Sequence, residues 1–312
     1  MTEPGTVLIT GPTRNLGRHT VLALAGRPEA QRPDLLLVGR AGPDLTAVAD
    51  EARALGARVR EIGGDLSSLA DVRGAAATAR DLLAAGAVRP LRALVANAGL
   101  MSADTRRASV DGYELTFAVD YLAHAQLIGD LLGSFAAPAR VVLVGSNTYH
   151  ANFWRKLLHV PEADWADPLE IARPATGDQA PGMEAAGVAY SNAKLAILYY
   201  AHELQRHAGA DVGVSVFEPG WMPGTALGRG APAAFQAMSR ALARIPGVST
   251  PRRSGPLLAA MVVDGKWAHL RDGAFVLKDR LTEVEPVAHD RDRERRLWEA
   301  TAELLERATS PR

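Results

Sequence analysis

Short apolar segments alternate with longer amphipathic segments through the first two thirds of the chain. The segments that predict buried strands are 6–10, 35–38, 57–62, 93–96, 141–144 and 212–217, and those that predict helices are 16–25, 45–55, 69–83, 112–132 and 189–207. Buried strands that alternate with helices form βαβ units with right-handed crossovers and a parallel sheet. We therefore predict an α/β fold with a single Rossmann-type, doubly wound parallel sheet and helices on both faces.

The charges of the chain are balanced, since it has 35 Lys and Arg residues and 35 Asp and Glu residues among 312. A balanced charge gives no electrostatic support for a nucleic-acid or membrane partner. The absence of cysteine excludes disulfides, thiolate catalysis and cysteine-bound zinc. The apolar stretch at 257–263 is too short to span a bilayer, and Glu3 and Pro4 leave no signal peptide in view. We expect a cytoplasmic protein whose partner is a small molecule.

Two segments interrupt the alternation, and a charged tail follows it. Residues 149–187 contain four prolines and little periodicity, and residues 221–250 are rich in Gly, Pro and Ala, with a short helix expected at 233–243. We predict one catalytic domain over 1–285 that includes both segments, followed by a helical tail over 286–312. The tail carries an apolar stripe that predicts a docked surface helix, formed by Leu297, Trp298, Leu304 and Leu305.

The turn between the first predicted strand and the first predicted helix is rich in glycine. It runs through Gly11, Thr13, Arg14, Asn15, Leu16 and Gly17. Glycines allow a tight turn and a close approach of the backbone to a pyrophosphate, and the helix N-terminus supplies free amides and a partial positive charge. An ordinary turn between a strand and a helix is the alternative, but the position after the first strand favours nucleotide binding.

The end of the second predicted strand carries Arg40, where an NAD-binding protein often has an acidic residue for the ribose hydroxyls. Arg14, inside the glycine-rich turn, supplies a second guanidinium. Two guanidiniums suit a 2′-phosphate, so we predict NADP(H) rather than NAD(H) as the cofactor. The alternative is that Arg40 is an ordinary surface residue.

Tyr190 and Lys194 are four residues apart in a predicted helix, so both side chains lie on one face of it. An ammonium group close to a phenol favours the phenolate and lowers the pKa of the phenol. A phenol tuned in this way can act as an acid or base for a carbonyl or an alcohol. The same spacing also occurs by chance in many helices, so the other motifs of the chain decide between these interpretations.

Together with further motifs, these residues resemble the short-chain dehydrogenase/reductase family. The glycine-rich turn is similar to the family's Thr-Gly-x-x-x-Gly-x-Gly, with Asn15 at the middle glycine. The other matches are Asp65-Leu66, Asn97-Ala98-Gly99 with Ala96 in place of an asparagine, Ser146, Tyr190 with Lys194, and Pro219-Gly220 followed by Trp221, Met222 and Thr225. The resemblance implies that Asp65 and Leu66 contact adenine, that 97–99 line the cofactor site, and that 219–225 contact the nicotinamide and the phosphates.

The resemblance also implies hydride transfer between the nicotinamide and a substrate carbon. Tyr190 would be the general acid/base, Lys194 would lower its pKa and hold the nicotinamide ribose, and Ser146 would stabilise charge on the substrate oxygen. Asp120 stands where the family has an asparagine that holds a water beside the lysine. We expect Asp120 to preserve this proton relay in altered form or to change it, and to raise the pKa of Lys194. The alternative is a helix residue that contacts backbone.

Within the family, the chain resembles the protochlorophyllide-reductase and retinol-dehydrogenase branches at 144–146, in the long insertion and in the C-terminal helix. We predict an NADP(H)-dependent oxidoreductase that acts on a carbonyl or alcohol of a fairly large apolar or aromatic molecule. The alternatives are reduction of a carbon–carbon double bond, and a non-catalytic NADP-binding regulatory or scaffold protein. The resemblance further implies a homodimer or homotetramer that associates through the helices after strands four and five.

The two interrupting segments could give the substrate pocket an apolar, aromatic wall. The candidates, for each of which packing in the core is an equal alternative, are Phe153, Trp154, Trp165, Trp221 and Met222. His150 and His159 lie in the first segment near Asp164, but their spacing does not match a metal site. We therefore predict no bound metal.

Overall fold

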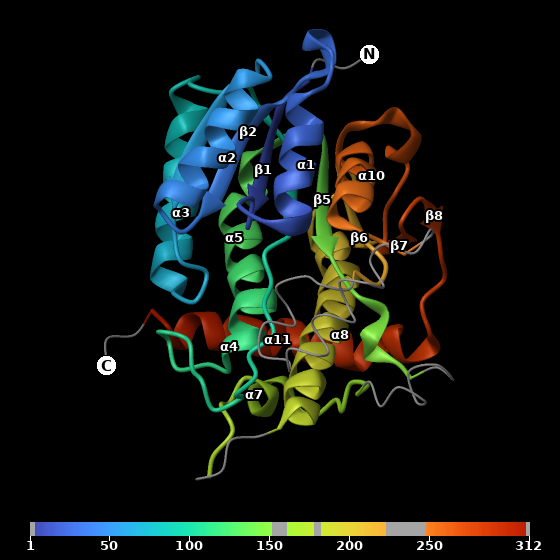
Figure 1. Ribbon diagram of the computed structural model, residues 1–312. Coiled ribbons are helices and arrows are strands. Elements are labelled where there is room, and N and C mark those ends of the chain that lie inside the picture. Colours follow the sequence, from blue (N-terminus) through green and yellow to red (C-terminus); the bar gives the residue numbers. More distant parts are fainter. Residues whose placement is uncertain (1–3, 152–160, 178–181, 223–247, 310–312) are drawn as a thin grey trace.

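A computed structural model of the protein describes residues 4–151, 161–177, 182–222 and 248–309 (Figure 1). Its central sheet has eight strands in the order β3-β2-β1-β4-β5-β6-β7-β8. Neighbouring strands from β3 to β7 pair in parallel, and β8 pairs antiparallel with β7. The strands are β1 (Thr6–Thr10), β2 (Asp34–Gly39), β3 (Val59–Gly63), β4 (Leu91–Ala96), β5 (Phe135–Val144), β6 (Val212–Glu218), β7 (Ala274–Leu277) and β8 (Arg280–Leu281). The predicted α/β class with a doubly wound sheet is confirmed.

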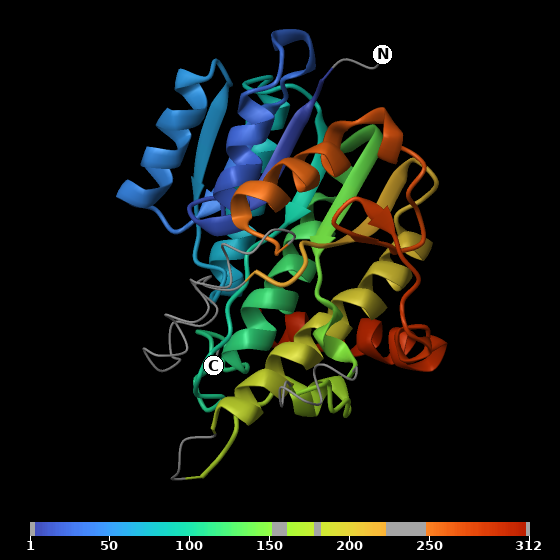
Figure 2. The same cartoon turned by 45° about the vertical axis from the view of Figure 1, so that its right-hand side comes forward.

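Helices cover both faces of the sheet (Figures 1 and 2). One face is covered by α1 (Asn15–Ala25), α2 (Pro43–Ala54) and α10 (Pro251–Val263), and the other by α3 (Leu69–Ala84), α5 (Ala123–Leu131) and α8 (Met183–His207). Successive strand residues point to opposite faces, so Val7 and Ile9 belong to the first of these two core layers and Leu8 to the second. Coverage on both faces explains why the predicted strands are continuous apolar runs.

The direction in which the chain builds the sheet reverses at β1. From β1 the strands extend outward to β2 and β3, and the chain then returns to the other side of β1 with β4, β5 and β6. Ligands of doubly wound sheets bind outside the carboxyl ends of the strands at such a switch point. The carboxyl ends of β1, β4, β5 and β6 therefore form the edge at which a functional site is expected.

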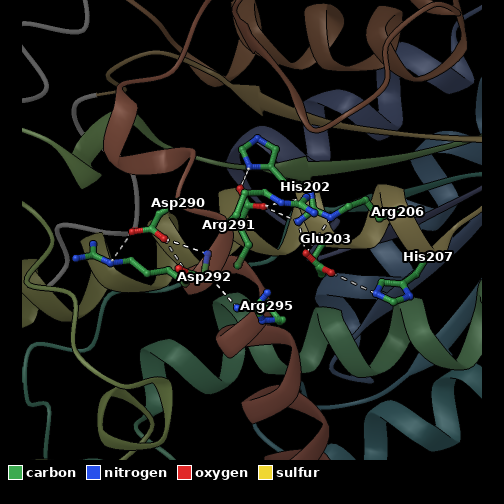
Figure 3. Close-up of polar contacts among 10 residues, drawn as sticks. His202, Glu203, Arg206, His207, Asp290, Arg291, Asp292 and Arg295 are labelled. Atoms are coloured by element: carbon green, nitrogen blue, oxygen red, sulfur yellow. Dashed lines mark hydrogen bonds and ion pairs between the residues drawn. The ribbon is translucent and has the colours of Figure 1, made fainter.

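The C-terminal helix α11 (Arg291–Arg307) crosses the outer side of α8 (Figure 1). The four residues of the predicted stripe are buried or partly buried against the core: Leu297, Trp298, Leu304 and Leu305. Trp298 stacks on Tyr200 of α8 with 5.6 Å between the ring centroids. Polar side chains of α8 and of the start of α11 meet along one flank (Figure 3), where Glu294 pairs with Arg206 and its Oε1 lies 2.8 Å from His202 Nδ1. The predicted docking of the stripe is therefore confirmed.

The segment predicted as one helix over 112–132 is shorter and composite. It begins at Leu115 and consists of α4 (Leu115–Phe117), a π-helical turn η2 (Ala118–Leu122) and α5. Glu114 fixes the beginning, because its side chain accepts a hydrogen bond from the Phe117 N–H at 2.7 Å. Single π-helical turns of this kind are frequent at functional sites.

Other differences from the predicted elements are small. Strand β5 begins at Phe135 rather than at 141, and β7 and β8 extend the sheet beyond the six predicted strands. Two short helices, η4 (Asn147–Tyr149) and α7 (Pro168–Ile171), lie in the insertion. The helix predicted at 233–243 lies outside the described residues. Across the described part of the chain, every helix is too short or too polar to cross a membrane.

Candidate active site

The glycine-rich turn after β1 uses left-handed backbone conformations at Gly11 and Asn15, with φ of +62° and +45°. Asn15 opens α1, and asparagine is among the few side chains that tolerate this region. This explains how asparagine can stand at the motif's middle glycine. A Cβ on Gly17 would lie 2.2 Å from the carbonyl oxygen of Gly11, so a larger residue does not fit there. The first turn of α1 therefore packs closely against the glycine-rich turn, which includes Thr13 and Leu16.

Asn97 holds this turn against the end of β4. Its Nδ2 donates hydrogen bonds to the carbonyl oxygens of Thr10 at 2.9 Å and Gly11 at 3.0 Å. Ala98 packs directly against Gly11, where an added Cβ would lie 2.8 Å from the Ala98 Cα. Asn97 and Ala98 therefore shape the predicted cofactor site, and the Asn97 amide nitrogen is already engaged by the turn.

Asp65 and Leu66 follow β3 at the same edge of the sheet. Asp65 Oδ1 accepts hydrogen bonds from the N–H and the hydroxyl of Ser67, each at 2.9 Å. Leu66 belongs to the core, with 8% of its surface exposed. Their contact with adenine stays a prediction.

The side chains of Tyr190, Lys194 and Asp120 converge beside the end of β5. Lys194 Nζ lies 3.0 Å from Asp120 Oδ2, and it donates a hydrogen bond to the carbonyl oxygen of Val144 at 3.2 Å. The same nitrogen lies 5.2 Å from the centroid of the Tyr190 ring. Lys194 and Asp120 are buried, with 4% and 0% of their surfaces exposed. The structure thus brings the three predicted residues into one cluster.

Asp120 projects from the π-helical turn η2, and both of its carboxylate oxygens are held. Oδ2 faces Lys194, and Oδ1 accepts a hydrogen bond from the Leu100 N–H at 2.7 Å. A Cβ on Gly99 would lie 2.9 Å from Oδ2, so glycine at this position permits the close approach. Asp120 therefore connects the 97–100 segment after β4 with Lys194 on α8.

The cluster changes the protonation of its members. Burial lowers the pKa of Lys194, but Asp120 and other neighbours outweigh this effect and raise it, in the predicted direction. Burial raises the pKa of Tyr190 to about 12, while Lys194 lowers it. The carboxylates of Asp120 and Glu218 also act to raise it, and the value of about 12 is the balance of all four effects. Lys194 therefore acts on Tyr190 in the predicted direction, but it does not outweigh burial and two carboxylates.

Ser146 follows β5 and caps the short turn η4. Its Oγ accepts a hydrogen bond from the Thr148 N–H at 3.3 Å. Helix α8 packs against η4, so the Ser146 loop lies beside the helix that carries Tyr190 and Lys194. This arrangement agrees with the predicted grouping of Ser146 with the other two residues.

Glu218, at the end of β6, was not predicted from the sequence. Its side chain accepts hydrogen bonds from the N–H groups of Asn147 at 2.7 Å and Gly220 at 3.1 Å. It therefore lies between the Ser146 loop and the Pro219-Gly220 turn. The sequence signal that could have indicated Glu218 is an acidic residue directly after the predicted strand 212–217.

His124 of α5 was also not predicted, and it connects Asp120 with the glycine-rich turn. Its Nδ1 lies 3.0 Å from the Asp120 carbonyl oxygen, and its Nε2 lies 2.9 Å from Thr10 Oγ1. Burial lowers the pKa of His124 to about 4, so the ring is neutral. A carbonyl only accepts, so Nδ1 carries the proton and Nε2 accepts from the Thr10 hydroxyl. Thr10 Oγ1 in turn accepts from the N–H groups of Asn97 and Ala98, each at 3.0 Å. The sequence signal that could have indicated His124 is a histidine within a largely apolar predicted helix.

The two arginines predicted to bind a 2′-phosphate follow β1 and β2 at the same edge. Arg40 is exposed. Arg14 pairs with Asp44 at 2.6 Å, and both side chains are exposed. An exposed ion pair contributes only about 0–1 kcal/mol, so Asp44 does not prevent Arg14 from turning toward a phosphate.

The segment after β6 begins with a tight turn. Gly220 has a φ of +80°, which favours glycine there. Trp221 is 62% exposed, and Met222 packs against one layer of the core. Thr225 lies outside the described residues, so its contact with the cofactor stays a prediction.

Few of the predicted pocket-wall residues can be placed at the site. Trp165 packs edge-on against Tyr199 of α8 with 4.9 Å between the ring centroids, so it lies partly buried against the core. His150 Nε2 lies 3.8 Å from Glu285 Oε1. Two of the pocket-wall candidates, Phe153 and Trp154, lie outside the described residues, and so does His159. Within the described ranges, no group of His, Asp and Glu side chains is arranged to hold a metal ion.

The chain is similar in sequence to known proteins. A family model described as short chain dehydrogenase matches residues 5–154. A protein of Streptomyces sp. (strain C5), named as the daunorubicin C-13 ketoreductase DnrU, is 30% identical over 305 residues, which cover 96% of this chain and 92% of that relative. The chain belongs to the short-chain dehydrogenase/reductase family.

Other relatives agree with this assignment. Mouse retinol dehydrogenase 14 is 31% identical over 245 residues, or 72% of this chain. The match spans 63% of the length of the mouse protein, and the same share of two Streptomyces oxidoreductases. A solved short chain dehydrogenase from Burkholderia cenocepacia J2315, in complex with NADP, superposes with a TM-score of 0.62 at 20% identity, over 91% of this chain and 97% of that one. This last likeness shows the fold.

Proposed function

We propose that the protein is an NADP(H)-dependent carbonyl reductase or alcohol dehydrogenase in which Tyr190 is the general acid/base. The observation that carries this proposal is the buried cluster in which Lys194 Nζ lies 5.2 Å from the Tyr190 ring and 3.0 Å from Asp120. A phenol beside a fixed cation, at the carboxyl ends of parallel strands, suits proton transfer to a bound carbonyl. The relative named as a ketoreductase supports a carbonyl group, rather than a carbon–carbon double bond, as the reacting group.

In the reducing direction, Tyr190 donates its proton to the substrate oxygen as the carbonyl becomes an alkoxide. Burial raises the pKa of Tyr190 to about 12, so the phenol enters the reaction protonated at neutral pH. Lys194 stabilises the phenolate that remains, because its ammonium group lies beside the ring. Ser146, on the adjacent loop, donates a hydrogen bond to the same substrate oxygen and stabilises the charge that develops there.

The glycine-rich turn fits the pyrophosphate of a dinucleotide. Helix α1 begins there with no side-chain cap and no acidic residue in its first turn, so its first amides and its positive end are open to an anion. NADP(H) supplies the hydride when it is bound. Lys194 and the Pro219-Gly220 turn would hold the nicotinamide end, and Arg14 and Arg40 would hold the 2′-phosphate.

A fairly large apolar or aromatic substrate fits the proposal best. Trp221 is 62% exposed directly after the Pro219-Gly220 turn, where an indole face can cover an aromatic ring. The names of two relatives, a retinol dehydrogenase and a daunorubicin ketoreductase, support a molecule of this size class.

Replacing Tyr190 tests the proposed acid/base. Tyr190→Phe should lower carbonyl reduction by roughly 10²–10⁴-fold, because it removes the proton donor and keeps the ring. Activity is measured as NADPH oxidation with a panel of aromatic ketones and quinones, and NADPH affinity, measured by fluorescence, should not change. Tyr199→Phe is the control, since this phenol on the same helix donates to the Val287 carbonyl oxygen. Wild-type turnover by the Tyr190 variant would contradict the proposal.

Replacing Arg40 tests the proposed cofactor. Arg40→Ala should weaken NADPH binding by roughly tenfold to a hundredfold, because a charge-assisted contact with the 2′-phosphate is lost. NADH lacks this phosphate, so its affinity should change little. Arg60→Ala, an exposed arginine on β3, is the control. An unchanged ratio of NADPH to NADH affinity in Arg40→Ala would remove Arg40 from the cofactor site.

A further inference from the structure

Glu218 is a buried carboxylate at the site, although the proposed reaction gives it no role. It is the last residue of β6, every residue of which is buried, and only 4% of its surface is exposed. Burying a charged group is costly unless it is well hydrogen-bonded. Glu218 meets this condition with two backbone donors, the N–H groups of Asn147 and Gly220, at 2.7 and 3.1 Å. These bonds favour the carboxylate form.

The two donors belong to the two loops that must hold the reactants. Asn147 directly follows Ser146, and Gly220 forms the turn proposed to hold the nicotinamide end. Strands β5 and β6 pair in register up to Val144 and Phe217, so both loops leave the sheet side by side. Beyond this point the Glu218 side chain links the two loops to each other. It thereby sets the position of Ser146 relative to the turn.

Glu218 also contributes charge to the proton donor. Three charged groups from three different elements act on Tyr190: Lys194 from α8, Asp120 from η2 and Glu218 from β6. A fourth charged residue, Lys278, lies against the turn: its backbone N–H donates to the Glu218 carbonyl oxygen at 2.8 Å, and a Cβ on Gly220 would lie 2.6 Å from the Lys278 Cε. Glu218 raises the pKa of both Tyr190 and Lys194. Its charge therefore favours the protonated form of both groups.

We propose that Glu218 is a positioning residue of the reaction, which fixes the Ser146 loop against the Pro219-Gly220 turn and adds its negative charge to those that act on Tyr190 and Lys194. This role rests on the proposed function of Tyr190 as the proton donor in carbonyl reduction. A neutral glutamine would fill the same volume, but it could accept from only one of the two amides and would carry no charge. The charge and the two hydrogen bonds therefore explain why a carboxylate is buried here.

The charge part of the proposal can be tested without a substrate. Nuclear magnetic resonance of protein labelled at the hydroxyl-bearing ring carbon of tyrosine reports the ionisation of each phenol, and the Tyr190 signal is assigned by its loss in Tyr190→Phe. In Glu218→Gln, Tyr190 should ionise at a lower pH than in the wild type, because a negative charge that opposes its ionisation is removed. Glu218→Asp keeps the charge, so it should titrate close to the wild type. An unchanged titration in Glu218→Gln would overturn the proposal.

A matched control separates this effect from loss of stability. Asp34→Asn also removes a buried carboxylate, which is 3% exposed and lies at the opposite, amino end of the strands. It should leave the Tyr190 titration unchanged, and an equal shift in Asp34→Asn would count against a local effect of Glu218. The titration does not depend on turnover. An unchanged titration together with a loss of reduction in Tyr190→Phe would contradict only the role of Glu218. A shifted titration together with wild-type turnover in Tyr190→Phe would instead contradict the proposed function.

The positioning part is tested by kinetics. With the aromatic ketone of the panel that turns over fastest, Glu218→Gln should lower kcat by roughly tenfold or more, since Ser146 is misplaced when the charge develops. In the oxidising direction, the rise of kcat with pH should move to lower pH in Glu218→Gln but not in Glu218→Asp. A loss of kcat with no movement of this pH profile would reduce Glu218 to a structural residue and contradict the proposal.

Discussion

At the scale of single residues, Lys194 is a buried cation whose charge is balanced inside the protein. Asp120 lies 3.0 Å from its ammonium group and is itself fully buried. Breaking such a pair by removing one partner costs about 3–5 kcal/mol, because the other charge is left uncompensated. An asparagine at 120 would offer a hydrogen bond without this charge. The aspartate thus fixes Lys194 more firmly, and its charge also opposes the ionisation of Tyr190.

His124 predicts a loss of stability in mild acid. Burial lowers its pKa to about 4 in the folded protein, below the 6.5 of an unperturbed histidine. Between these values the unfolded chain binds more protons than the folded protein, so stability is lost as the pH falls from 6.5 toward 4, by up to about 3 kcal/mol. We expect His124→Gln to lose less stability than the wild type between neutral pH and about pH 5, measured by thermal unfolding. His269→Gln, an exposed histidine, is the control, and equal acid sensitivity of all three proteins would refute the prediction.

At the scale of elements, the signals that lie within one segment could be predicted. The strands at 6–10 and 212–217 agree closely with β1 and β6, because strands covered on both faces are continuous apolar runs. The helix over 112–132 was predicted to begin too early, because Gly112 and Tyr113 lie in a turn before the Glu114 cap. The π-helical turn and the two-residue strand β8 leave no clear periodic pattern in the sequence.

The residues of the candidate site also fall into those that could be predicted from the sequence and those that could not. Tyr190 and Lys194 could be predicted because four residues of one helix bring them together. The positions of Glu218 and His124 depend on contacts between elements far apart in the chain, β6 with the loop after β5 and α5 with β1. The sequence around a single residue at the end of a strand, or inside an apolar helix, does not indicate such a contact.

The docking of α11 predicts a stability effect that belongs to this helix. Leu297 is fully buried, so Leu297→Ala should lower the free energy of unfolding by about 2–5 kcal/mol, measured by urea denaturation. Glu299→Ala, on the exposed side of the same helix, should change it by less than about 0.5 kcal/mol. Similar values for the two variants would mean that α11 is not held by its apolar stripe.

At the scale of the whole molecule, α11 covers the helices through which subunit association was expected. Its Thr301 Oγ1 lies 2.5 Å from the hydroxyl of Tyr121 in η2, and Arg73 of α3 donates to the Leu305 carbonyl oxygen at 2.9 Å. Trp298 of α11 also stacks on His207 of α8, with 4.3 Å between the ring centroids. The chain's own C-terminal helix therefore occupies part of the outer side of these helices, at η2 and along α8. A second subunit that used this part of the face would have to displace α11.

Removal of α11 should therefore promote association of the protein. A chain that ends at Ala288 should expose the apolar surface under Leu297 and Leu304, and such a surface drives association. Sedimentation velocity should show larger species for this chain than for the full chain, while a control chain that ends at Arg307, the last residue of α11, should sediment like the full chain. A separate peptide that covers 289–309 should reverse the association, because it can dock on the same face. If the chain that ends at Ala288 stays folded and sediments as the full chain does, α11 does not shield an association surface.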